Sequence, residues 1–178
     1  MKWMPYAAAI LSVAPIVGHS AQYLTVEQAQ KLMFPSSSMK RVAVKLTEDQ
    51  VKSLKKSSGI FYAFKADQVY QSPDGGWMVI DQVLGKHEMI TYAVALTAKG
   101  EVKQVEILTY NESYGGQVRD ASWRQQFVGK NVASPLALNK DIKNISGATL
   151  SSKHITDGVK RIVQFHQLVL HLTTDRQS

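Results

Sequence analysis

The chain of 178 residues is long enough for one domain with a real core, and 44% hydrophobic against 20% charged residues is ordinary for a globular protein. A formal net charge of +7 permits an anionic partner, but no run of positive residues reaches five, so we expect no nucleic-acid partner. The absence of cysteine excludes disulfides, thiolate-ligated iron–sulfur clusters and a thiol nucleophile. Any redox chemistry must therefore come from a cofactor that is held by other means.

The N-terminus has the pattern of a secretory signal peptide. Lys2 is followed by an apolar stretch over residues 7–17 and then by small residues. The alternative is an uncleaved membrane anchor, but the stretch is shorter than the roughly 20 residues that span a bilayer, and Pro15 interrupts it. We expect residues 1–21 to be removed on export, which places the mature protein in the periplasm or at the outer face of the cytoplasmic membrane.

Residues 22–70 are predicted to form an extension of helices and strands. Thr25 and Thr47 each begin a capping box, with a glutamine three residues later, and Gly59 is typical of a helix end. The segment "RVAVKL" alternates between apolar and other residues, and "GIFYAFKADQVYQ" is rich in aromatic residues. Both segments are therefore predicted to be strands.

Residues 71–178 are predicted to form the main domain. "GWMVIDQVLG" follows a Pro-Asp-Gly turn, and "MITYAVALTAKGEVKQVEILTY" predicts two strands around a turn at residues 98–100. Further on, "SSKHITDGVKRIVQFHQLVLHL" has helical spacing, with Ser151 or Ser152 as its natural N-cap. The predicted fold class is α+β: a twisted antiparallel sheet, a half-barrel-like meander with one face on the core, packed with helices that include a long C-terminal one.

The four residues from Ser146 to Thr149 stand immediately before this last helix. The first N–H groups of a helix are unpaired and lie at the positive end of its dipole, so a phosphate is stabilised there. Gly147 and Ala148 leave room for a ligand, and Thr149 adds a hydroxyl. The alternative is that Thr149 and the serines after it only cap the helix, and spacing alone favours this plainer interpretation.

The stretch Ser146-Gly147-Ala148-Thr149 resembles the flavinylation motif of FMN-binding domain proteins, which include the flavin subunits of the Rnf and sodium-translocating NADH:quinone reductase complexes. The resemblance implies that Thr149 is joined through its hydroxyl to the phosphate of FMN, and that a dedicated flavin transferase makes the bond. The family usually has an aspartate three residues before the serine, whereas this chain has Lys143 there. The cofactor-binding residues that this motif implies, besides Thr149, are Ser146, Gly147, Ala148, Leu150 and Ser151.

Two upstream segments extend the resemblance over roughly residues 75 to 170. "YNESYGGQV" resembles the family's E-T-P-G-x-G loop, and "WRQQFVGK" resembles its downstream tryptophan, phenylalanine and glycine pattern. A flavin ring is flat and apolar, so the nearby aromatic side chains are candidates to contact it, although core packing is the alternative for Trp123. Glu112 could bond the flavin or order its loop. The candidate cofactor-binding residues of these segments are Glu112, Tyr114, Gly115, Gly116 and Trp123.

A positive side chain near the reduced ring would raise its potential, and Arg119, Lys143 and Lys153 are candidates for this role. None of the five histidines belongs to an HExxH motif or a close ligand pair, so no metal site is predicted. There is no G-x-S-x-G motif, and no catalytic residue is assigned.

The leading hypothesis is therefore an exported, membrane-associated flavoprotein with covalent FMN. It would relay electrons between a membrane reductase and an extracytoplasmic acceptor, as a carrier or as a subunit rather than a stand-alone enzyme. Two alternatives remain open: a non-catalytic module that binds FMN or another phosphorylated ligand reversibly, and a flavin reductase with its own small-molecule acceptor.

Overall fold

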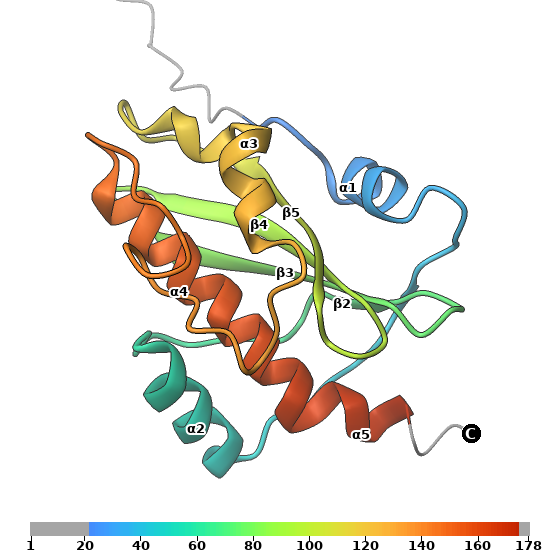
Figure 1. The fold of residues 1–178 in the computed structure, drawn as a ribbon. Helices are drawn as coiled ribbons and strands as arrows, with labels where there is room; N and C mark the ends of the chain where they lie inside the picture. The colour runs from blue at the N-terminus through green and yellow to red at the C-terminus, as the bar shows by residue number, and fades with distance from the viewer. Residues whose placement is uncertain (1–21, 175–178) are drawn as a thin grey trace, which may run out of the picture.

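The computed structural model describes residues 22–174, so the predicted signal peptide lies outside the described residues. A five-stranded antiparallel sheet forms its centre, in the order β1-β2-β3-β4-β5, and helices flank it (Figure 1). The strands are β1 (Lys40–Arg41), β2 (Val69–Gln71), β3 (Trp77–Leu84), β4 (Met89–Leu96) and β5 (Val102–Thr109). The predicted α+β fold class is confirmed. No helix within residues 22–174 is both long and apolar enough to cross a bilayer.

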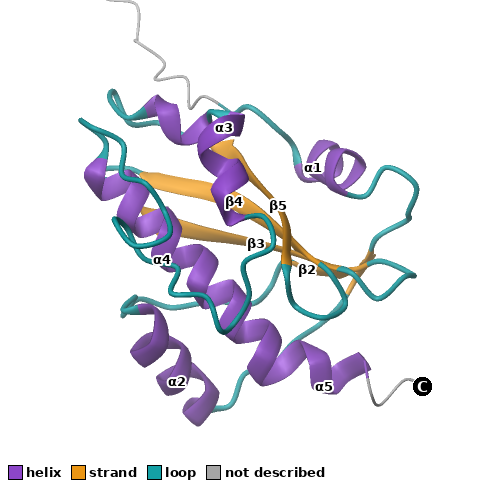
Figure 2. Cartoon of the chain, in the orientation of Figure 1, coloured by secondary structure: helices purple, strands orange, loops and turns teal. Residues whose placement is uncertain are grey.

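Both faces of the sheet are buried, where the sequence analysis expected only one. On one face, residues such as Tyr92 and Val94 join the main core beneath the C-terminal helix. On the other face, Ala93 and Ala95 pack with Met33 of α1 (Val26–Met33) in a second cluster. Figure 2 shows α1 on the opposite side of the sheet from the C-terminal helix. The N-terminal segment therefore covers the second face of β4, which explains why the residues on both faces of this strand are apolar.

The two predicted capping boxes are present. Thr25 begins α1 and Thr47 begins α2 (Glu48–Ser58), each with both reciprocal hydrogen bonds to the glutamine three residues later. Gly59 ends α2 in the left-handed conformation, with φ of 74°. These features depend only on residues within one helical turn of each other, which is why the sequence predicts them.

The two strand predictions in the N-terminal segment are wrong for most of their length. In "RVAVKL" only Arg41 belongs to a strand, and in "GIFYAFKADQVYQ" only Val69–Gln71 does. Besides α2, the segment between these two short strands holds no further helix or strand, and Ile60 and Phe64 are buried in the core. An alternating or aromatic pattern indicates that one side is buried, but it does not supply a hydrogen-bonding neighbour.

The chain leaves β5 through the 3-10 turn η1 (Gly116–Arg119), α3 (Ala121–Arg124) and the 3-10 turn η2 (Gln125–Phe127). It then reaches α4 (Thr149–Phe165), which continues through the π-helical turn η3 (His166–Leu170) into α5 (His171–Thr174). The long C-terminal helix is thus confirmed.

The start of α4 differs from the prediction. Its N-cap is Ala148, which makes no side-chain cap hydrogen bond, and Thr149 is its first residue. Ser151 and Ser152 therefore lie inside the first turn and are buried, so the prediction that one of them caps the helix is wrong. Later in the helix, a Cβ at Gly158 would meet the hydroxyl of Tyr92, which explains a glycine inside this helix by close packing on the sheet.

A buried ion pair joins α4 to the sheet. Arg161 donates to the Asp81 carboxylate from Nη2 at 2.6 Å and from Nε at 3.0 Å, and the Tyr92 hydroxyl donates to the same carboxylate at 2.8 Å. Asp81 lies on β3, whose last residue leads directly into the turn at the functional site. The pair therefore holds the register between α4 and the strand on which that turn depends.

Candidate functional site

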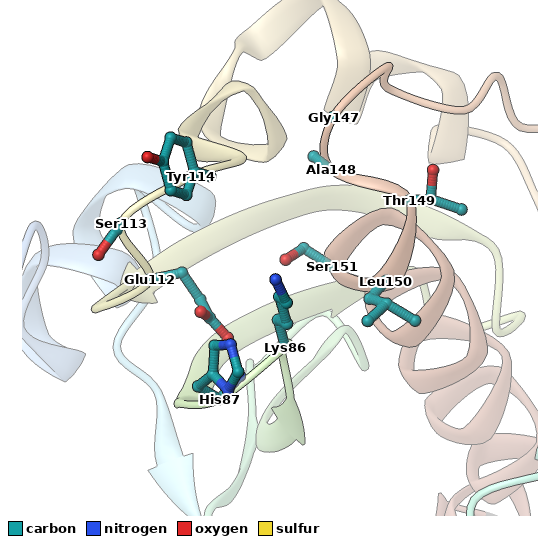
Figure 3. Close-up of a pocket in the computed structure, with 10 residues that line it drawn as sticks. All are labelled: Lys86, His87, Glu112, Ser113, Tyr114, Gly147, Ala148, Thr149, Leu150 and Ser151. Atoms are coloured by element: carbon teal, nitrogen blue, oxygen red, sulfur yellow. The ribbon is translucent and has the colours of Figure 1, made fainter.

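A pocket of about 480 Å³ opens at the end of the sheet where α4 begins (Figure 3). Three segments form it: the turn between β3 and β4, the loop after β5, and the loop that enters α4. Its volume falls within the range of about 300–1,000 Å³ that small-molecule and cofactor sites occupy. The lining residues are Lys86, His87, Glu112, Ser113, Tyr114, Gly147, Ala148, Thr149, Leu150 and Ser151.

The entry to α4 places a hydroxyl and unpaired backbone donors on one wall of the pocket. Gly147 has φ of 80°, a conformation that L side chains rarely adopt, and the chain turns there into the helix. Thr149 follows as the first helical residue, where backbone N–H groups have no partner within the helix. Its side chain is exposed, and Oγ1 accepts a hydrogen bond from Nδ2 of Asn144 at 3.0 Å. This wall can bind a phosphate group and offers an accessible hydroxyl beside it.

The loop after β5 is fastened to α4 through Tyr110. Its hydroxyl donates to the Tyr114 carbonyl at 2.5 Å and lies 3.2 Å from Oγ of Ser151, which is buried. Burial raises the pKa of Tyr110 above its ordinary value, so this donor stays protonated. A Cβ at Gly115 would lie 2.6 Å from the Tyr110 hydroxyl and 2.8 Å from Cβ of Ala148. Glycine is therefore needed for the loop to approach the start of α4 this closely.

Glu112 orders the turn opposite. Its carboxylate accepts the backbone N–H of His87 at 2.6 Å and that of Glu88 at 3.0 Å. Burial would raise the pKa of this carboxyl, but the backbone donors outweigh burial and hold the pKa below its usual value. Of the two roles considered from the sequence, the observed contacts are those of a residue that orders the pocket wall.

The positive charge in the pocket comes from a residue that the sequence analysis did not select. Lys86 lines the pocket, and Figure 3 shows its side chain directed between Glu112 and the first turn of α4. The three side chains predicted for this role do not line the pocket: Arg119, Lys143 and Lys153. The Arg119 guanidinium lies over the Tyr23 ring at 3.6 Å, and Lys153 pairs with Asp157 at 2.5 Å. A lysine in a strand-to-strand turn carries no sequence signal of this role, and neither do His87 and Ser113.

The structure separates Trp123 from the pocket. Its side chain is 7% exposed, and its ring packs edge-on against Phe127 with centroids 5.2 Å apart. The indole N–H donates to the Lys143 carbonyl at 2.8 Å, so Trp123 supports the loop that enters α4. Among the other predicted cofactor-binding residues, Ser146, Gly115 and Gly116 flank the lining without belonging to it. Within residues 22–174, no group of three or more metal-binding side chains is present.

The part of the chain that forms the pocket matches a known protein family. The family model of FMN-binding domains matches residues 85–164, a range that includes every residue lining the pocket. Residues 85–164 of this chain are therefore similar to FMN-binding domains.

One curated relative is a subunit of the Na(+)-translocating ferredoxin:NAD(+) oxidoreductase complex of Acetobacterium woodii. It is 31% identical to this chain over 81 residues, which cover 40% of this chain and 39% of the relative. The chain thus spans about two fifths of the length of the curated relative that it matches.

Proposed function

We propose that the protein is an exported electron-transfer flavoprotein that carries FMN through a phosphoester bond to Thr149. It relays electrons between a membrane reductase and an extracytoplasmic acceptor. The observation that carries the proposal is the exposed Thr149 hydroxyl at the first residue of α4, on the wall of a pocket in an FMN-binding domain. Export rests on the pattern of residues 1–21.

The residues of the pocket fit FMN. The N-terminus of α4 favours the phosphate, while Tyr114 and Leu150 offer aromatic and aliphatic surface for the flat ring. Lys86 adds positive charge to the same cavity. When bound, FMN supplies the redox chemistry, and the chain's part is to hold it and to set its electrostatic surroundings.

The attachment requires a partner protein for chemical reasons. Thr149 Oγ1 forms a bond to the flavin-side phosphorus of a flavin dinucleotide, the pyrophosphate bond breaks, and a nucleoside monophosphate leaves. The hydroxyl proton must pass to a base. The side chain that is hydrogen-bonded to Oγ1 is the Asn144 amide. Its NH₂ group donates the hydrogen bond and cannot take up that proton. A flavin transferase that brings both the base and the dinucleotide meets this need.

An exposed rim suits transfer of electrons to another protein. The Tyr114 side chain is 82% exposed at the edge of the pocket, so a partner can approach a flavin held there. The relative's name describes a subunit of an oxidoreductase complex, and we extend that kind of membrane partner to this chain. A covalent bond also prevents loss of the cofactor by diffusion outside the cytoplasm.

Intact mass tests the proposal. After co-expression with a flavin transferase and export, the protein should gain the mass of one FMN less water and should stay yellow when denatured. Thr149→Ala should abolish both properties, whereas Thr149→Ser retains a hydroxyl and should still be modified. A flavin that washes out on denaturation would instead support the reversible binding module. Steady turnover of the isolated protein with a defined donor and acceptor would support a flavin reductase.

A further inference from the structure

The loop that enters α4 is held from behind by α3 and η2. Trp123 donates its indole N–H to the Lys143 carbonyl at 2.8 Å, and Gln126 Oε1 accepts the Lys143 backbone N–H at 2.8 Å. Gln126 is itself oriented, because its amide nitrogen donates to the Trp123 carbonyl at 3.0 Å. Both backbone groups of Lys143 are thus bonded to side chains from a packed helical turn. Its own side chain is exposed and makes no hydrogen bond or ion pair with residues 22–174.

This anchoring determines where the next residue points. Asn144 follows Lys143 directly, and its Nδ2 donates to Thr149 Oγ1 at 3.0 Å. The bond closes the loop across Gly147, between the anchored backbone and the first residue of α4. A continuous set of contacts therefore runs from Trp123 and Gln126, through the Lys143 backbone and the Asn144 amide, to the attachment hydroxyl.

We propose that Asn144 is the positioning residue for covalent attachment at Thr149. A hydroxyl oxygen has two lone pairs, and the Asn144 bond occupies one and restrains the side-chain rotamer. The other lone pair is left to form the bond to phosphorus. The proposal rests on the proposed phosphoester. It also gives Lys143 a role through its backbone, so the missing aspartate side chain does not remove the support of the loop.

Modification kinetics test this role. The unmodified full-length chain, made without a flavin transferase, is incubated with purified transferase and flavin adenine dinucleotide, and intact mass is followed with time. Asn144→Ala should lower kcat by roughly three- to tenfold, the effect of losing one hydrogen bond, with little change in KM for the protein substrate. Trp123→Phe, which keeps an aromatic ring but loses the N–H, should lower kcat by a smaller factor. Lys140→Ala, an exposed change in the same loop, is the control and should react at the wild-type rate.

The outcomes separate this inference from the proposed function. If Asn144→Ala is modified at the same rate as the wild type, the positioning role is overturned and the proposed phosphoester is unaffected. An effect of Asn144→Ala on KM alone also overturns it, because that result assigns the residue to transferase recognition. Wild-type protein that stays unmodified overturns both. Equal urea midpoints for the variants and the wild type exclude unfolding as the cause of a slower reaction.

Discussion

Protonation of one buried histidine should make the fold sensitive to acid. His166 lies on the π-helical turn η3, is 3% exposed, and its Nε2 has no hydrogen-bond partner among the described residues. Burial, with a smaller contribution from His171, lowers the pKa of His166 from 6.5 to about 4. The folded protein thus keeps this imidazole neutral over a pH range in which the unfolded chain binds a proton.

The sign and size of the effect follow from linkage. Stability from this residue is complete above about pH 7 and is lost as pH falls through 6.5 towards 4, because the unfolded state then binds more protons. One pKa unit corresponds to about 1.4 kcal/mol, so the loss should reach about 2 kcal/mol by about pH 5 and about 3 kcal/mol by about pH 4.

Urea unfolding of the flavin-free protein, followed by circular dichroism at several pH values, measures this loss. His166→Phe keeps an aromatic ring but cannot titrate. Between about pH 7 and about pH 5 it should therefore lose about 2 kcal/mol less free energy of unfolding than the wild type. His166 also makes a hydrogen bond to the backbone of Ala98, which the phenylalanine variant loses. The absolute stabilities of the two proteins therefore differ, and the quantity to compare is the change of stability with pH. If His166→Phe is as acid-sensitive as the wild type, the reasoning is refuted.

Three further substitutions test the pocket and its support. Lys86→Gln should lower the midpoint potential of the bound flavin by tens of millivolts, on the order expected for one partly screened charge, as measured by redox titration. Gly115→Ala should destabilise the fold by about 1–3 kcal/mol and weaken flavin binding, because φ is 86° and the new Cβ meets the Tyr110 hydroxyl. Arg161→Met should cost about 3–5 kcal/mol in thermal or urea unfolding, since it leaves the Asp81 carboxylate buried without its partner.

Matched changes define the controls for the first two of these substitutions. Lys153→Gln removes an exposed positive charge outside the pocket lining, and because solvent screens that charge it should leave the potential within about a few millivolts of wild type. Gly116→Ala places a Cβ where no atom lies within 4 Å, so it should be much milder than Gly115→Ala. An unchanged potential in Lys86→Gln would remove Lys86 from the electrostatics of the ring. Equal effects of the two glycine changes would remove the close approach at Ala148 as the explanation.

Local pattern was sufficient for several features of this protein. The capping boxes at Thr25 and Thr47 and the β4–β5 hairpin depend on residues that are neighbours in the chain, and the sequence predicted all of them. The small-residue stretch before the last helix is also a local feature, although the helix begins at Thr149 and not after Ser151 or Ser152 as predicted. Because Gly147, Ala148 and Thr149 are adjacent, their common place on the pocket wall follows from the sequence once the helix is recognised.

Tertiary structure determines which other residues lie beside the stretch from Gly147 to Thr149. Lys86 lines the pocket because α4 packs on the sheet beside β3, and the buried Asp81–Arg161 pair is one contact between these elements, which are far apart in sequence. Trp123 lies behind the loop because its large ring is buried against Phe127, leaving only its N–H for the Lys143 backbone. A residue's type states which contacts it can make. The long-range packing of helices on both faces of the sheet determines which of those contacts form. Burial in this packed core restricts each side chain to one conformation out of the many that it adopts in the unfolded chain.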